Sequence, residues 1–268
     1  MQTKRETPLT IPLAVAIAVA VAIFGAFVGS GALGGTAINE AAGGYLGADA
    51  TLLAPAGPAF GIWSVIYLGL AVYAVWQLLP VARRSNLQGR VRVICAASAV
   101  LNALWIGSVQ LGWLGISVVV MLLLLLTLIL IFRVLAQSEV QHTAERWIMW
   151  LTFGPYLGWV SVATIANIAA WLSSLGVLLT YWWSQPAAVV LLIVATLIGA
   201  ASVLSSRGKI SMAMAMVWGI AWIGVGRSDG ESASALVSVS AYSFAALLLL
   251  YALASAWRLR VRPATRVS

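Results

Sequence analysis

Eight long apolar stretches, separated by short polar connectors, take up most of this sequence. A helix needs about 20 apolar residues to cross the hydrocarbon core of a bilayer, and most of the stretches come near that length. Because lipid offers no hydrogen-bond partners to the backbone, such runs fold as helices. The sequence therefore predicts an all-α, polytopic integral membrane bundle of about eight transmembrane helices. The stretches run over about 9–32, 59–79, 93–113, 116–135, 147–172, 187–204, 210–225 and 235–257.

The composition is incompatible with a water-facing surface. Only 8% of the residues are charged and 62% are hydrophobic, whereas soluble domains usually carry about 25% charged residues. The net charge of +8 comes from short basic clusters between the apolar runs, not from one exposed face. Nucleic-acid binding needs a basic patch on a soluble fold, so no nucleic-acid partner is expected.

The basic residues also predict how the chain crosses the membrane. With eight spans and the N-terminus inside, 14 of the 15 lysines and arginines fall in inside segments, and only Arg227 falls outside. Cytoplasmic connections are enriched in these residues, and losing the short stretch 210–225 would move four C-terminal arginines outside. The first stretch is longer than a signal-peptide core. We therefore expect a multi-pass protein of the cell (inner or plasma) membrane, with an uncleaved first span and both termini cytoplasmic.

Residues that commonly carry chemistry are scarce. The single cysteine, Cys95, lies in an apolar run, and the single histidine, His142, lies in a polar connector, which leaves too few ligands for a zinc site. None of the seven acidic residues lies within a predicted span, which disfavours proton-coupled transport and acid–base catalysis. We expect no metal, no required cofactor and no catalytic residue, and hence a protein that is not an enzyme.

Three spans carry aromatic and amide side chains at spacings that place them on one helix face. Trp63 and Tyr67 are four residues apart on the second span. Amides are costly when they face lipid, so they should face the interior of the bundle. The third span repeats the pattern with Asn102 and Trp105, and the fifth with Pro155, Trp159, Ala163 and Asn167, with Tyr156 beside them.

Spacing alone leaves two interpretations of these stripes open. In the first, the asparagines tie helices together and the aromatic rings fill the core. In the second, flat rings and a few polar groups line a ligand cavity, since ligand sites are mostly apolar with few polar anchors.

A resemblance to a known family favours the second interpretation. The segment PYLGWVSVA at 155–163, followed by Asn167, resembles the fifth-helix signature PYLxWVxxAxxxN of the translocator protein family, also called tryptophan-rich sensory proteins (TspO/MBR). NALW at 102–105 is similar to the third-helix NxxW of that family. WSVIY at 63–67, preceded by Phe60, is similar to its second-helix WxxLY. The resemblance covers about residues 10–173, and the chain's 13 tryptophans agree with it.

The resemblance implies a domain organisation and a site. It implies a five-helix domain over 9–173, between a cytoplasmic N-terminal tail (1–8) and a three-helix C-terminal extension (174–257), which ends in a basic cytoplasmic tail (258–268). It implies a pocket for a tetrapyrrole such as porphyrin or haem, or for a sterol-like lipid, with membrane lipid and a second copy of the chain as further partners. The ligand-binding residues implied by position are Phe60, Trp63, Tyr67, Asn102, Trp105, Tyr156, Trp159 and Asn167.

The leading functional hypothesis is therefore a membrane receptor, sensor or transporter-like protein that binds a flat hydrophobic ligand. One alternative is a small-molecule carrier, although no convincing internal repeat supports alternating access. Another is a weak porphyrin-degrading enzyme in which Trp159 or Tyr156 is oxidised. A purely structural protein would bind no saturable ligand.

Four smaller features complete the expectations. The outside connector 34–57 is rich in glycine and alanine, so a loose loop is favoured over a lid. Gly25 and Gly29 form a small-residue pair suited to close helix packing. Trp218 and Trp222 share a helix face, and core packing is their expected role. Interfacial belts are expected at Trp147 with Trp150 and at the cluster 181–183.

Overall fold

Helices make up the fold of this chain. The computed structural model describes residues 6–261 except 30–35, 39, 139–141 and 178–180, and these described residues form helices and no β-strand. Two short 3-10 helices, η1 (Ala42–Gly44) and η2 (Gly57–Gly61), lie between α1 and α2. The all-α prediction is confirmed. The α-helices are α1 (Thr10–Gly29), α2 (Ile62–Trp76), α3 (Pro80–Arg83), α4 (Asn86–Gln110), α5 (Leu114–Gln137), α6 (Thr143–Ser174), α7 (Ser184–Ser205), α8 (Ser211–Gly226) and α9 (Ala235–Val261).

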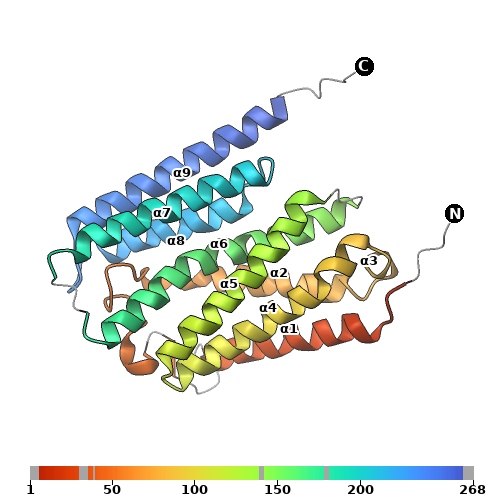
Figure 1. Ribbon diagram of the computed structural model, residues 1–268, viewed down its shortest axis with the longest axis horizontal. Helices are drawn as coiled ribbons and strands as arrows, with labels where there is room; N and C mark the ends of the chain where they lie inside the picture. The colour runs from red at the N-terminus through yellow and green to blue at the C-terminus, as the bar shows by residue number, and fades with distance from the viewer. Residues whose placement is uncertain (1–5, 30–35, 39, 139–141, 178–180, 262–268) are drawn as a thin grey trace.

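The lengths of these helices fit a membrane. Seven helical segments among the described residues are long and apolar enough to cross one, and they include α1, α4, α5, α6 and α7. The predicted seventh span is α8, whose 16 residues extend about 24 Å, less than the roughly 30 Å hydrocarbon core. α1 begins and α9 ends at the same end of the bundle (Figure 1), as an even number of crossings requires.

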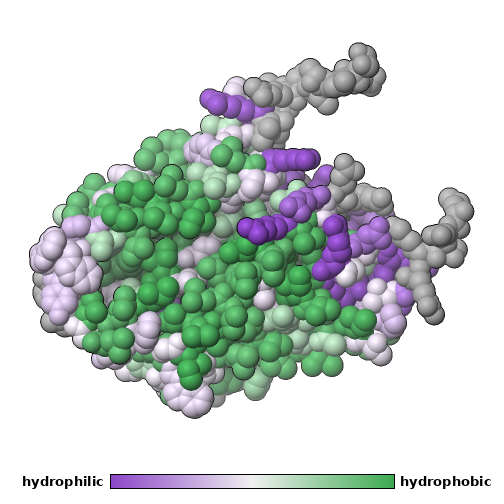
Figure 2. All heavy atoms as spheres, in the orientation of Figure 1, coloured by the Kyte–Doolittle hydropathy of each residue, from purple (hydrophilic) through white to green (hydrophobic). Residues whose placement is uncertain are grey.

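The surface hydropathy follows the same axis. In Figure 2 hydrophobic atoms cover the middle of the visible face, and strongly hydrophilic atoms gather at the end where α1 begins and α9 ends. We call this end the basic end, because the connection from α2 to α4 places Arg83 and Arg84 there and the start of α4 adds Arg90. The opposite end holds the α1–α2 and α8–α9 connections. Lys4, Arg5 and residues 262–268, which also contribute to the topology prediction, lie outside the described residues.

α6 lies at the centre of the bundle. It contacts α2 and α5 on one side and α8 on the other, and it is the most deeply buried of the candidate spans. Two glycines permit its close approach to α8. A Cβ added at Gly154 would overlap Ser211 Oγ, and one at Gly158 would overlap the Met212 carbonyl oxygen. α6 is therefore the element through which the C-terminal extension docks onto the preceding helices.

The predicted small-residue pair on α1 packs inside the bundle. A Cβ added at Gly29 would lie 2.7 Å from Ile106 of α4, and one at Gly25 would lie 3.9 Å from Ala103. α1 contacts α4 more extensively than it contacts α2. This asymmetry leaves part of the α2 face next to α1 uncovered.

The prediction that no acidic residue lies within a span is wrong for Glu145. α6 begins at Thr143 rather than near 147, so Glu145 lies in its first turn, where the helix dipole favours a negative charge. Its side chain is 2% exposed, and it accepts hydrogen bonds from Ser85 Oγ at 2.6 Å and Gln88 Nε2 at 3.1 Å. These partners allow a carboxylate to be buried at the basic end.

The belt prediction is wrong for Trp150. Its ring is buried and packs edge-on against Phe132 of α5, with 5.6 Å between ring centroids. Trp147, one turn earlier, is 54% exposed. The two tryptophans are three residues apart, but α5 covers only the face of α6 that carries Trp150.

Candidate functional site

Aromatic rings from α2 and α4 stack at the end of the bundle away from the basic end. Trp63 stacks on Tyr67, one turn later on α2, with ring centroids 5.3 Å apart and planes inclined by 18°. Trp105 of α4 lies on Trp63 at 6.3 Å and 25°. Offset stacking of this kind is a preferred geometry for aromatic pairs. We call these three stacked rings the aromatic wall.

Rings from α6 and η2 meet the same tryptophan edge-on. Trp159 lies 6.3 Å from Trp63 at an interplanar angle of 84°, and Tyr156 lies 6.0 Å from it at 70°. Phe60 packs edge-on against Trp159 at 5.7 Å. Trp63 is therefore the point at which α2, α4 and α6 converge.

The two predicted asparagines connect helices. Asn102 is fully buried on α4, and its Oδ1 accepts a hydrogen bond from the Tyr67 hydroxyl at 2.9 Å. Asn167 of α6 accepts at Oδ1 from Trp105 Nε1 at 3.3 Å and donates from Nδ2 to Ser117 Oγ of α5 at 3.0 Å. Both amides thus hold aromatic side chains of the wall in place, as the first interpretation of the stripes expects.

Three buried donors near the wall have no hydrogen-bond partner among the described residues. They are Trp63 Nε1, Trp159 Nε1 and Asn102 Nδ2. An unsatisfied buried donor usually costs about 1–3 kcal/mol, so such groups call for an explanation. A ligand that carries a carbonyl or carboxylate oxygen would satisfy a donor of this kind.

A hollow of about 770 Å³ lies between α1, α2 and α4. Four of the predicted residues line it: Phe60, Trp63, Tyr67 and Trp105. Ligand cavities usually have volumes of about 300–1,000 Å³, so the hollow is large enough for a small-molecule ligand. Its remaining walls come from α1 and from the chain just before α2.

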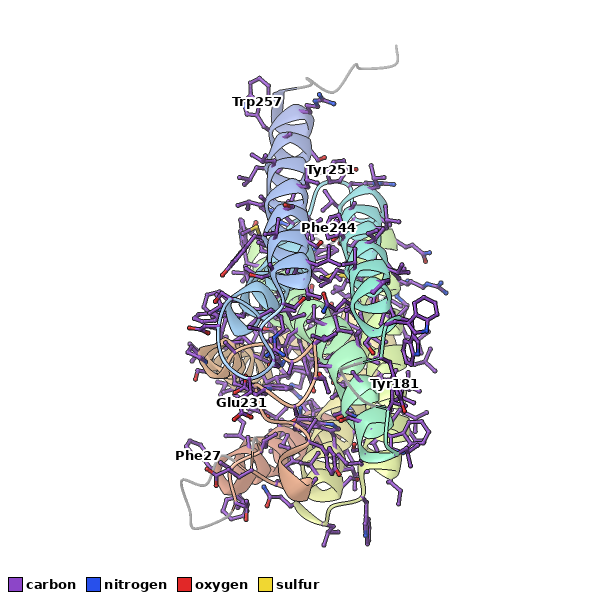
Figure 3. All side chains as sticks on the ribbon, turned by 90° about the vertical axis from the view of Figure 1, so that its left-hand side faces the viewer. Phe27, Tyr181, Glu231, Phe244, Tyr251 and Trp257 are labelled. Atoms are coloured by element: carbon purple, nitrogen blue, oxygen red, sulfur yellow. The ribbon has the colours of Figure 1, made fainter. Side chains whose placement is uncertain are left out.

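The rim of this hollow faces outward. Phe27 on α1 and Leu68 on α2 both line it and are 56% and 67% exposed. In Figure 3 the Phe27 side chain points away from the bundle. Large apolar side chains on the flank of a membrane protein contact lipid, so the hollow opens towards lipid between α1 and α2.

A second, smaller hollow of about 40 Å³ adjoins the wall. On the helix side it is lined by Trp159 and Asn167, and it shares Trp63, Trp105 and Phe60 with the large hollow. On the other side it is lined by residues of the α1–α2 connection: Tyr45, Leu46, Thr51, Ala54 and Pro55. We call residues 45–56 the lid segment.

The prediction that this connector is a loose loop is wrong for the lid segment. Its backbone is held by α8 and by the residue that follows it: Ala56 N donates to the Trp222 carbonyl oxygen at 3.0 Å, and Thr51 O accepts from Arg227 Nη1 at 2.6 Å. Leu52 is buried. Burial lowers the pKa of the Arg227 guanidinium below its usual value, and the nearby Asp49 carboxylate opposes that shift.

Two predicted site residues line neither hollow. Asn102 supports Tyr67 from behind, and the fully buried Tyr156 donates its hydroxyl to the Ser98 carbonyl oxygen at 3.3 Å. The amide of Asn102 and the hydroxyl of Tyr156 form hydrogen bonds with other residues inside the bundle. They are bracing residues, whereas Phe60, Trp63, Tyr67, Trp105, Trp159 and Asn167 line one or both hollows.

Two parts of the site are not predicted from the sequence. They are the α1 face around Ile23 and Ala26, which lines the large hollow, and the lid segment, which lines the small one. A signal for the first was the Gly25–Gly29 pair, which indicates a helix packed closely against its neighbours. A signal for the second was Leu52 followed by Leu53, an apolar pair out of place in a solvated loop.

Among the residues that the structure describes, no group of three or more His, Cys, Asp or Glu side chains could hold a metal ion. Histidine and cysteine occur once each in the chain.

Apolar helices of membrane-spanning length around an aromatic hollow define a multi-pass membrane protein with an interior suited to a small molecule. The chain belongs to the TSPO-like protein family, whose model matches residues 11–254. The match runs through α7, α8 and most of α9, beyond the residues 10–173 that carry the sequence resemblance. This membership indicates a membrane ligand-binding or transport role, and the family is generally not enzymatic. Neither a curated protein nor a solved structure gives a match.

Proposed function

We propose that this protein binds a flat hydrophobic molecule, a tetrapyrrole such as porphyrin or haem or else a sterol-like lipid, in the hollow between α1, α2 and α4. The observation that carries the proposal is the cavity of about 770 Å³ walled by Trp63, Tyr67 and Trp105. A planar ligand would stack on these rings, which are themselves stacked.

The chemistry of the lining supports a ligand that arrives from lipid. None of the described residues that line the two hollows is charged. The exposed apolar rim at Phe27 and Leu68 gives a hydrophobic molecule a way in from the bilayer. Trp63 lines the hollow and carries an indole N–H without a partner among the described residues, and a porphyrin carboxylate would accept a hydrogen bond from such a donor.

Binding is the step that sensing and transport share. Membership of the family supports a role of that kind, and the hollow supports the binding step. The proposal therefore concerns binding, on which either sensing or transport would depend.

The proposal is tested by titrating protoporphyrin IX into the purified protein in detergent and following the porphyrin absorbance band. We expect saturable binding. Trp63→Leu should weaken it about tenfold, because it removes the ring on which the wall is built. The matched control is Trp257→Leu, which removes a 68% exposed tryptophan from α9, away from the hollow, and should leave affinity unchanged.

The titration has outcomes that contradict the proposal. A signal that rises without saturation indicates partition into the micelle. Equal affinities for wild type and both variants would show that porphyrin binds elsewhere. Displacement of the porphyrin by a water-soluble sterol ester would show that both ligand classes share the hollow, whereas porphyrin binding that the ester does not affect would restrict the proposal to the tetrapyrrole.

A further inference from the structure

Arg227 carries a buried positive charge on the side of the membrane where the topology prediction expects few basic residues. It comes directly after the last residue of α8 and is the single basic residue that the topology prediction places outside. Its side chain is nevertheless 0% exposed. Burying a guanidinium is unfavourable unless it is hydrogen-bonded, so the partners of Arg227 indicate what it does.

Those partners belong to the lid segment. Nη1 of Arg227 donates to the Thr51 carbonyl oxygen at 2.6 Å, and Nη2 donates to the Ala48 carbonyl oxygen. The Asp49 carboxylate lies 3.9 Å from Nη2 but is 60% exposed, so it contributes less than the two carbonyls. The rigid fork of an arginine suits two adjacent acceptors of this kind.

Other residues of α8 and of the α8–α9 connection also contact the chain between α1 and α2. Trp218 Nε1 donates to the Ala59 carbonyl oxygen at 2.9 Å, and Ser232 Oγ donates to Asp49 Oδ1 at 3.0 Å. A Cβ added at Gly226 would lie 3.2 Å from the Ala54 carbonyl oxygen. Figure 3 shows the α8–α9 connection, which carries Glu231, beside the α1–α2 connection.

The lid segment therefore has two contacting faces. One face carries the carbonyls that Arg227 binds. The other contributes Thr51, Ala54 and Pro55 to the small hollow against Trp159 and Asn167. A movement of the segment away from α8 would open the aromatic wall at the end of the bundle opposite the basic end.

We propose that Arg227 is a positioning residue through which the C-terminal extension holds the lid segment closed over the aromatic site and so controls access from the aqueous side. This inference rests on the proposed function for its meaning, because a lid matters only if the site is occupied. The closed position of the segment is testable without any ligand.

The test measures access to the small hollow. In a Cys95→Ala background, Ala54→Cys places one thiol at a position that is 6% exposed and lines that hollow. The protein in detergent is treated with a charged maleimide, and labelling is followed by mass spectrometry. Arg227→Gln should speed labelling about tenfold, since it removes charge-assisted hydrogen bonds. Labelling of the Arg227→Gln protein at the original rate would overturn the proposal.

Controls separate an opened lid from a disordered protein. Leu111→Cys, an exposed position in the α4–α5 connection, should label equally fast with and without Arg227→Gln. Arg227→Lys keeps the positive charge but loses the planar guanidinium that donates to two carbonyls, so the labelling rate at Ala54→Cys should be intermediate. If Arg227→Gln does not fold, Arg227→Lys replaces it: lysine keeps the positive charge but cannot donate to the Thr51 and Ala48 carbonyl oxygens together, so labelling should be about threefold faster, and an unchanged rate contradicts the proposal.

A second arm uses protoporphyrin IX. Dissociation of the porphyrin from Arg227→Gln should be several times faster than from wild type, and an unchanged rate alongside faster labelling would contradict a role of the lid in access. If wild type shows no saturable binding, the proposed function fails, whereas the labelling rates still decide whether Arg227 closes the segment.

Discussion

At the scale of single residues, Trp63 organises the site and buried polar side chains hold it. Trp63 contacts rings from α2, α4 and α6, and the hydroxyl of Tyr67 and the amide of Asn102 fix the rotamers behind it. These contacts already restrict the ring side chains in the folded protein, so a ligand that binds beside them would cause little further loss of side-chain entropy.

Tyr67→Phe tests this bracing. The substitution leaves both polar atoms of the Asn102 amide without a partner, since Nδ2 has none among the described residues. We expect a loss of about 1–3 kcal/mol in stability, seen as a lower unfolding temperature in detergent. Tyr242→Phe, at a 43% exposed position on α9, is the control and should have little effect. Equal unfolding temperatures would argue against bracing by Asn102.

Glu145→Ala tests the buried carboxylate at the basic end. Its loss leaves Ser85 Oγ and Gln88 Nε2 without their shared acceptor, and we expect destabilisation by about 3 kcal/mol. Glu40→Ala, at an exposed position, should be neutral. An unfolding temperature of Glu145→Ala equal to that of Glu40→Ala would show that the network does not stabilise the fold.

At the scale of elements, the spacing of residues predicted which helix faces turn inward but not which rings meet. The pairs Trp63–Tyr67 and Asn102–Trp105 lie on inward faces, as the period of a helix requires. Their contacts with α6 depend on how three helices rotate and cross, which no single helix encodes. The order of the lid segment depends on Arg227, 176 residues after Thr51 in the chain, and local composition carries no trace of that pairing.

Gly158→Ala tests the joint between α6 and α8. The added Cβ would overlap the backbone oxygen of Met212, which cannot rotate away, so the two helices must separate. We expect a lower unfolding temperature and faster proteolysis of the C-terminal extension. Gly107→Ala is the matched control, since nothing lies within 4 Å of its added Cβ and alanine favours a helix. Identical behaviour of the two variants would contradict close packing at this joint.

At the scale of the whole molecule, the distribution of basic residues predicted that the chain begins and ends on the same side of the membrane. α1 and α9 meet that expectation, and α8 is the short crossing on which it depends. The sequence could not show that the C-terminal end of α8 and Arg227 directly after it hold the lid segment, because those contacts form only when distant parts of the chain pack together. The division at residue 173 remains a prediction.

A reporter fused after residue 268 tests the topology. The bias of 14 basic residues to one predicts a cytoplasmic C-terminus, so a reporter active only inside the cell should be active. One that is active only outside should be silent, and the reverse result would contradict eight crossings with a cytoplasmic N-terminus.

The most direct test of the ligand site is photo-crosslinking with a diazirine-bearing porphyrin and subsequent peptide mapping. We predict saturable labelling on α1 around Ile23–Phe27 and on α2 around Trp63–Leu68, reduced by excess unlabelled porphyrin. Labelling confined to lipid-facing residues of the extension, such as Leu197 and Leu250, and insensitive to competition would contradict it.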